Sequence, residues 1–264
     1  MKYGSTFEIN RHKKQDAGAS RYILGLRVDY TTYARATDKV INMVQQDGRG
    51  YVCISNVHMV MEAFDDAAFR DVVNKADLVT PDGMPLVWGL KLLGIKDAQR
   101  VYGPDLMPVV CARAESLKIP IGLYGGTDQV VAMLSRRLKK DFPELEIAYA
   151  FSPPFRQLTK EEDAQVIKEV IASGAKILFV GVGCVKQERW MHEHRDKIPA
   201  VMLGVGAAFD FIAEVKPQAP AWLQKLGLEW LFRLSTEPKR LWRRYLYHNP
   251  RFLYGFAKQL LTQK

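Results

Sequence analysis

The feature that most constrains this chain is a regular alternation of short apolar runs with amphipathic stretches of helical length. The runs predicted to be strands are 51–55, 77–80, 119–124, 146–150, 176–182 and 200–205. The stretches predicted to be helices are 57–76, 85–93, 103–117, 128–142, 160–173 and 186–195. Strands that alternate with helices of this length predict an α/β fold with a mainly parallel sheet and helices on both faces.

The domain organisation follows a change in composition near residue 216, where Lys216-Pro217-Gln218-Ala219-Pro220 marks a junction. We expect a core at residues 21–215, a flexible polar lead-in at 1–20 and a basic helical appendage at 216–264. The lead-in lacks the apolar segment of a signal peptide, and no uncharged apolar run reaches the roughly 18 residues that span a bilayer. The three cysteines form no CxxC pair. These features predict a cytoplasmic protein whose contact with a membrane is peripheral.

The appendage is the most distinctive segment by composition. It holds ten lysines and arginines against two acidic residues, in a chain whose formal net charge is +9. Aromatic residues are interspersed among these cations, which predicts three amphipathic helices at 222–234, 239–248 and 251–261, separated by Pro238 and Pro250. Such helices lie in the headgroup plane of an anionic membrane. The alternative is a tail that packs against the core with its basic face in solvent.

Candidate site residues follow the predicted strands, because ligands of parallel α/β sheets bind beyond the carboxyl ends of the strands. Asn56 follows the first strand and could orient a sugar hydroxyl, or simply cap a helix. Asp82 lies in a Pro-Asp-Gly sequence and could act as a general base, although an ordinary turn is the simpler reading. Arg100 could bind a phosphate or a substrate hydroxyl.

Two glycine pairs add a candidate anion or nucleotide site. Gly181 and Gly183 follow one strand, and Gly204 and Gly206 follow another. Glycines between a strand and a helix N-terminus favour bound phosphate. Neither pair completes GxGxxG, since Lys186 and Phe209 replace the third glycine, so each is weak evidence for a dinucleotide site.

Three arginines of the appendage have a spacing that suits a diphosphate. Arg233, Arg240 and Arg243 are separated by seven and three residues, which places them on one side of a continuous helix. Pro238 interrupts that helix, so their convergence is a hypothesis.

Several motifs are absent from the sequence: GxxxxGK[ST], GxSxG and HExxH. We expect no metal site and no bound cofactor. A nicotinamide-dependent oxidoreductase and a non-catalytic module that binds a membrane or nucleic acid remain as alternatives, and the tail is not expected to bind nucleic acid. Self-association of the chain is left open.

Five ordered motifs give the chain a specific resemblance to a known family. The motifs begin at Thr80 (TPDGM), Arg100 (RVYGPDLM), Gly181 (GVGCVKQE), Gly204 (GVGAAFD) and Gly227 (GLEWLFRL). From about Tyr22 onward, the chain resembles the WecG/TagA/CpsF glycosyltransferases, glycosyltransferase family 26.

The resemblance implies a Rossmann-like core whose C-terminal appendage contacts the membrane and completes the active site. It implies an inverting, metal-independent transfer from a UDP-sugar to a polyprenyl-diphosphate-linked sugar during cell-surface polysaccharide assembly. Carried over residue by residue, it makes Asp82 the catalytic base. The residues expected to bind substrate are Asn56, Arg100, Gln187, Arg233, Arg240 and Arg243. The residues expected to line the nucleotide pocket are Gly181, Gly183, Lys186, Gly204 and Gly206.

The chain departs from its relatives at three places. It has Ile54 where many have Thr, Met84-Pro85 where teichoic-acid relatives have small residues, and Cys184-Val185 where Ser-Pro is common. These departures leave the donor open between UDP-glucose and UDP-N-acetylmannosamine or its uronic acid.

Overall fold

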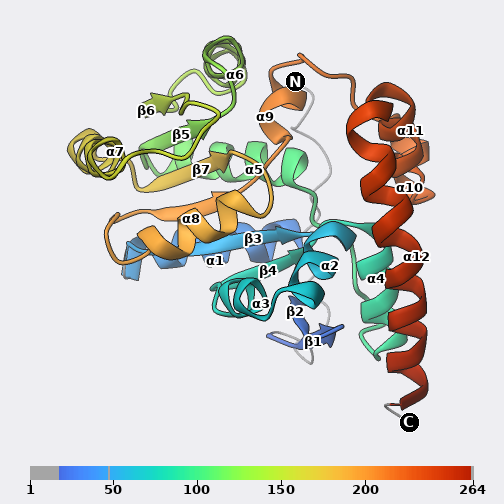
Figure 1. Ribbon diagram of the computed structural model, residues 1–264. Helices are drawn as coiled ribbons and strands as arrows, with labels where there is room; N and C mark the ends of the chain where they lie inside the picture. The colour runs from blue at the N-terminus through green and yellow to red at the C-terminus, as the bar shows by residue number, and fades with distance from the viewer. Residues whose placement is uncertain (1–17, 47, 263–264) are drawn as a thin grey trace.

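The computed structural model describes residues 18–46 and 48–262, and its centre is a six-stranded parallel sheet (Figure 1). The strand order is β4-β3-β8-β7-β5-β6. The strands are β3 (Gly50–Ser55), β4 (Leu78–Pro81), β5 (Ile121–Gly125), β6 (Ile147–Phe151), β7 (Ile177–Gly181) and β8 (Val201–Gly204). Every pairing in this sheet is parallel, so the predicted α/β class and its parallel sheet are confirmed.

Each face of the sheet has its own hydrophobic core, because successive side chains of a strand point to opposite faces. In β3, Tyr51 and Cys53 join one cluster and Val52 and Ile54 join the other. The helices of the first cluster are α2 (Val57–Asp65), α3 (Ala67–Asn74), α4 (Met84–Leu92), α7 (Lys160–Ser173) and α8 (Lys186–His194). Those of the second cluster are α1 (Tyr33–Gln46), α5 (Gly103–Ser116), α6 (Asp128–Asp141) and α9 (Ala208–Ile212).

Local signals place several helix ends where the sequence predicts them. The side chain of Thr159 accepts a hydrogen bond from the backbone N–H of Glu162, whose own side chain bonds back to Thr159, and α7 begins there. Gly174, with φ of 75°, ends α7 in the left-handed conformation that suits glycine. Asp66 was not recognised as a cap. It accepts a hydrogen bond from Phe69 and divides the helix predicted at 57–76 into α2 and α3.

The sequence reading missed the N-terminal part of the fold. β1 (Ser20–Ile23) and β2 (Leu26–Asp29) form an antiparallel hairpin whose turn is made by Leu24 and Gly25, both with positive φ. Ser20 already belongs to β1, whereas residues 1–17 of the expected lead-in lie outside the described residues.

The appendage forms three helices, but not with the predicted boundaries. They are α10 (Ala221–Lys225), α11 (Glu229–Thr236) and α12 (Pro238–Thr262). Gly227, at φ of 73°, separates the first two. Pro238 does begin a new helix, whereas Pro250 lies inside α12, so the predicted break there is wrong. An internal proline removes one backbone hydrogen bond, and the packing of Phe252 and Phe256 in the first core offsets that loss.

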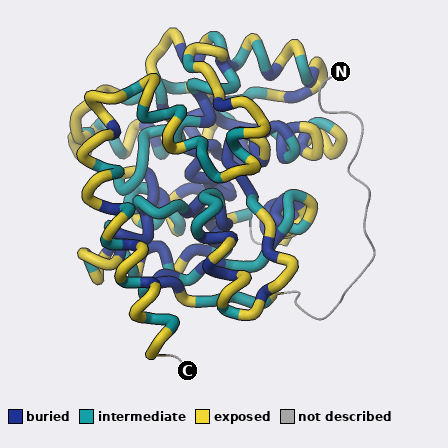
Figure 2. The backbone as a smooth tube through the Cα atoms, turned by 90° about the vertical axis from the view of Figure 1, so that its right-hand side faces the viewer, coloured by how far each residue is buried: buried dark blue, intermediate teal, exposed yellow. Residues whose placement is uncertain are grey.

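The helix α12 runs along one side of the core (Figure 1), where it packs against α2. Leu241, His248, Phe252 and Phe256 are buried on its inner face, and exposed residues alternate with them around the helix (Figure 2). Near its end, Gln259 accepts a hydrogen bond from the backbone N–H of Leu24 (2.8 Å). No helix in the described part of the chain is long and apolar enough to cross a bilayer.

Candidate active site

Polar residues gather where β4, β3, β8 and β7 end, because these strands are parallel neighbours and their carboxyl ends share one edge of the sheet. Asp82 follows β4, Asn56 follows β3, and the two glycine pairs end β8 and β7. The backbone N–H of Asp82 donates to the carbonyl of Ser55 (2.8 Å), which fixes the Asp82 turn beside the end of β3. The strand order therefore brings together residues that are far apart in the sequence.

Arg100 holds Asp82 in place. Its Nε donates to the backbone carbonyl of Asp82 (2.5 Å), and its Nη2 lies 3.3 Å from the Asp82 carboxylate. The same Nη2 donates to the carboxylate of Glu229 at 2.6 Å, and Nη1 donates to Gln224 at 3.3 Å. The guanidinium lies 3.9 Å from the ring centroid of Tyr102. Since Gln224 belongs to α10 and Glu229 to α11, the appendage takes part in orienting the Arg100–Asp82 pair.

The Asp82 carboxylate has the properties of a general base. Burial raises its pKa from the usual 3.8 to about 6, because the charged form loses solvation. Arg100 opposes this rise, and the negative charge of Glu229 adds to it. A base with a pKa near the working pH is deprotonated at neutral pH and still accepts a proton readily.

The core and the appendage together enclose a cavity of about 550 Å³ around Asp82. Asn56, Asp82 and Arg100 line it from the core, and Glu229 and Arg233 line it from the appendage. Much of the remaining lining is apolar, including Val57, Trp88, Leu246, Phe252 and Leu253. The volume is in the range of small-molecule sites, and the mixed lining suits a ligand with both charged and apolar parts.

Two arginines of the appendage supply positive charge to the cavity, Arg233 from α11 and Arg244 from α12. The Nε of each is buried and has no hydrogen-bond partner among the described residues. Burial lowers the pKa of Arg244, and Arg233 adds to that effect. Buried donors without partners are unfavourable, so an anion bound here would be stabilised by both.

Arg240 and Arg243 do not line this cavity. Arg240 is exposed and pairs with Glu237 at 2.6 Å, while Arg243 is exposed and stacks over Trp242. The helical register explains the difference. At about 100° per residue, Arg243 lies about 140° around α12 from the buried His248, whereas Arg244 lies only about 40° from it.

Asn56 is the N-cap of α2, because its side-chain oxygen accepts from the backbone N–H groups of His58 (3.1 Å) and Met59 (3.3 Å). It also lines the cavity. The predicted helix cap is confirmed, and contact of Asn56 with a sugar stays a prediction that its place in the cavity allows.

Gln187 and the glycines lie beside the cavity rather than in its lining. Gln187 is buried, accepts from the backbone N–H of Gly183 (3.2 Å) and packs close to Gly204. Its amide donates to the buried Glu188 (2.7 Å), whose pKa burial raises to about 7. Lys186 is exposed. This arrangement orders the loop after β7 without placing Gln187 against Asp82.

The sequence of the whole folded unit matches one family model, that of the glycosyl transferase WecG/TagA/CpsF family, over residues 21–264. The chain belongs to this family. Its similar relatives include proteins named N-acetylglucosaminyldiphosphoundecaprenol N-acetyl-beta-D-mannosaminyltransferase. The one from Bacillus spizizenii is 31% identical over 204 residues, which cover 77% of each sequence. The one from Staphylococcus aureus is 29% identical over 239 residues, covering 89% of this chain and 91% of the relative.

The sequence left three classes of protein open. Membership of this family identifies the chain as a glycosyltransferase rather than an oxidoreductase or a non-catalytic module.

Three residues that line the cavity are not predicted from the sequence: Gln224, Glu229 and Arg244. Glu229 lies in the motif that begins at Gly227, so the motif itself was a signal for it. Arg244 was overlooked because its neighbour Arg243 fitted the assumed spacing. One group of the described residues could hold a metal ion, namely His58, Glu62 and His248 at the junction of α2 and α12.

Proposed function

We propose that this glycosyltransferase moves a sugar from a UDP-sugar to a sugar carried on polyprenyl diphosphate, in the assembly of a cell-surface polysaccharide. The relatives' names describe a transfer of this kind onto a diphosphoundecaprenol-linked sugar. The observation that carries the proposal is the cavity, in which the Asp82 carboxylate, the Arg233 and Arg244 guanidiniums and large apolar side chains occur together. The two substrates together carry groups that match these three: the acceptor hydroxyl for the carboxylate, the UDP diphosphate for the guanidiniums and the polyprenyl chain for the apolar side chains.

In the proposed mechanism, Asp82 removes the proton from the acceptor hydroxyl. The oxygen attacks the anomeric carbon of the donor sugar, the bond from that carbon to the UDP oxygen breaks, and UDP leaves with the electron pair. A single displacement inverts the anomeric configuration. Arg100 holds the carboxylate in position, and Arg233 and Arg244 offset the negative charge that develops on the diphosphate. Guanidiniums held in the cavity supply this stabilisation without a metal ion in the chemical step.

We assign the nucleotide to the Rossmann-like edge formed by the loops after β7 and β8. Gly183 and Gly206 allow close approach of a ligand to the backbone there, whereas Gly181 and Gly204 make room for Phe209 and for Gln187. Gln187 orders this loop through its bond to Gly183, and the exposed Lys186 lies at the N-terminus of α8, where it can meet the diphosphate. Asn56 then contacts the sugar from the end of β3.

In this proposal Arg240 and Arg243 do not bind the diphosphate, in contrast to Arg233. Both are exposed on α12, so they would meet anionic lipid headgroups rather than the leaving group. Three donors fit the proposal: UDP-glucose, UDP-N-acetylmannosamine and the uronic acid of the latter. A screen of these three donors with a short polyprenyl-diphosphate-linked acceptor identifies it.

The proposed base is tested by the variant Asp82→Asn, which keeps the shape of the side chain and removes its basicity. We expect transfer to fall by about 10²–10⁴-fold, the usual contribution of a general base, while UDP binding measured by calorimetry persists. Asp128→Asn is a matched control, because Asp128 is an exposed aspartate in the first turn of α6. Wild-type turnover by Asp82→Asn would refute the assignment.

A further inference from the structure

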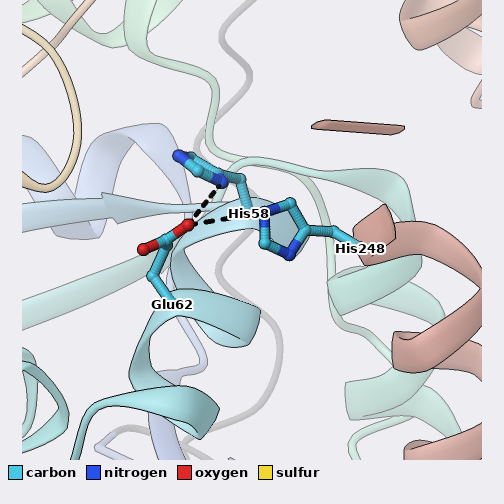
Figure 3. Close-up of side chains that lie close together, drawn as sticks. All are labelled: His58, Glu62 and His248. Carbon is cyan, nitrogen blue, oxygen red and sulfur yellow. Dashed lines mark ion pairs between the residues drawn. The ribbon is translucent and has the colours of Figure 1, made fainter. Parts of the chain in front are cut away.

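Two histidines and a glutamate meet where the appendage docks onto the core (Figure 3). His58 and Glu62 lie one turn apart on α2, and His248 reaches them from α12. The Nδ1 of His58 is 3.5 Å from Oε1 of Glu62, and the Nε2 of His248 is 3.4 Å from the same oxygen. The three candidate ligand atoms lie within 4.8 Å of one another.

These distances are long for hydrogen bonds, which join nitrogen and oxygen at about 2.7–3.2 Å. They match the separation of two atoms that share a zinc ion. Zinc binds imidazole nitrogen and carboxylate oxygen at about 2.0–2.2 Å, so neighbouring ligands of a tetrahedral ion lie about 3.3–3.5 Å apart.

The buried Nδ1 of His58 supports the same interpretation. It has no hydrogen-bond partner among the described residues, although it faces Glu62. A buried polar atom without a partner is unfavourable. A cation between His58, Glu62 and His248 would satisfy this nitrogen and would also use the Glu62 carboxylate.

The charges around the cluster come from α2 and α12. Asp65 of α2 is engaged by Arg251 of α12, with contacts of 2.5 and 2.8 Å. Glu62 and Asp65 act on His248 as anions, Arg251 acts on it as a cation, and Arg244 acts on both histidines. Arg244 weakens the attraction for a metal ion. An anion bound to Arg244 in the cavity would restore that attraction.

We propose that His58, Glu62 and His248 form a zinc site that fastens α12 to α2. Two imidazoles and one carboxylate are a ligand set that zinc favours over magnesium, which prefers oxygen. His58 and His248 also line the active-site cavity, so the proposed site borders that cavity. The site goes beyond the proposed sugar transfer. Its ion holds the appendage in place and takes no part in the chemical step.

The test measures zinc binding directly, on full-length protein without a polyhistidine tag. The protein is dialysed against chelator and titrated with Zn²⁺ or Mg²⁺ by calorimetry, and its bound metal is counted by mass spectrometry. We expect one Zn²⁺ per chain and no comparable binding of Mg²⁺. His248→Asn and Glu62→Gln should each weaken zinc binding at least about tenfold, which is the lower end of the loss for second-shell partners of a metal site.

The matched control is His192→Asn, because His192 lies on α8 and contacts Tyr51 rather than the cluster. It should bind zinc like the wild type. The docking role is read by hydrogen exchange of α12, which zinc should slow in the wild type and in His192→Asn but not in His248→Asn. Circular dichroism checks that each variant is folded. If His248→Asn does not fold, zinc binding by Glu62→Gln tests the proposal instead. Absent or non-stoichiometric zinc binding, or equal binding by the wild type and both cluster variants, overturns the proposal.

Discussion

At the level of single residues, the pKa of the Asp82 carboxyl depends on Arg100, whose positive charge is shared between Asp82 and Glu229. Arg100 lies 3.3 Å from Asp82 but 2.6 Å from Glu229. Its attraction for Asp82 lowers the pKa of that carboxyl, while burial and the charge of Glu229 raise it to about 6. Glu229 is therefore a positioning residue: it acts on the base through Arg100 and by its own negative charge.

We predict that Glu229→Gln moves the acidic limb of the kcat/KM profile to lower pH. Removal of a negative charge near Asp82 favours the ionised carboxylate, and Arg100 becomes free to pair with it, so the pKa of Asp82 falls. The lower pKa makes a weaker base, so transfer above pH 7 should also decrease, by far less than the ~10²–10⁴-fold contribution of the base itself.

Glu237→Gln is the control for this experiment, because Glu237 is an appendage acid that pairs with Arg240 and Lys216 instead of Arg100. Its pH profile should match the wild type. A Glu229→Gln profile whose acidic limb stays in place, or moves to higher pH, would show that Glu229 does not act on Asp82.

At the scale of secondary-structure elements, α12 has two faces with different tasks. Phe252 is 2% exposed and belongs to the core on one side of the sheet, whereas its neighbour Leu253 is 67% exposed. Phe252 thus holds the appendage on the core, while Leu253, the next residue along the helix, is mostly exposed to solvent. This division also explains why α12 continues through Pro250, since its buried face keeps contact with α2 on both sides of the proline.

We predict opposite results for alanine at these two neighbouring positions. Phe252→Ala should lower the free energy of unfolding by about 3–5 kcal/mol, because it removes buried apolar contacts and leaves a cavity. Leu253→Ala should change it by less than about 0.5 kcal/mol, as surface substitutions usually do. Urea unfolding measures both, and similar losses at the two positions would contradict the assigned orientation of α12.

At the scale of the whole molecule, exposed apolar surface is concentrated on the appendage. Of the eighteen large hydrophobic residues that are exposed in the described chain, ten lie between Trp222 and Leu261. The exposed cations Lys239, Arg240 and Arg243 occur in the same segment. Exposed apolar and basic side chains in one segment favour an anionic bilayer, so we expect this segment to contact the membrane.

We predict that the double variant Trp242→Ala/Leu246→Ala binds anionic vesicles several-fold more weakly than the wild type in a sedimentation assay. Trp242 is 46% exposed and Leu246 is 68% exposed, so the variant loses apolar contact area while the core is unchanged. Phe155→Ala, at a residue 87% exposed and far from the appendage in sequence, is the control. Unchanged binding by the double variant would place the membrane contact elsewhere.

Point variants are more informative here than removal of the appendage after Lys216. Truncation would delete Phe252 and Phe256 from the core and Glu229 from its bond with Arg100. Loss of activity would then follow from loss of structure as readily as from loss of membrane contact.

The parallel α/β core and the residues that follow its strands could be predicted from the sequence. Alternating apolar runs and helical stretches are local patterns, and strands that run parallel necessarily place Asn56 and Asp82 at one edge. The hairpin of β1 and β2 was not predicted, because its strands SRYI and LRVD interrupt their apolar residues with polar ones. The equally short β4 and β8 lie in apolar runs.

Only the tertiary structure decided how the appendage completes the site. Arg244 rather than Arg243 faces the cavity because the packing of α12 against α2 fixes the rotation of the helix, and no spacing in the sequence records that rotation. Glu229 reaches Arg100, and His248 reaches His58 and Glu62, through contacts between segments far apart in the chain. Such contacts depend on where whole elements dock, which is set by the shapes of their buried faces.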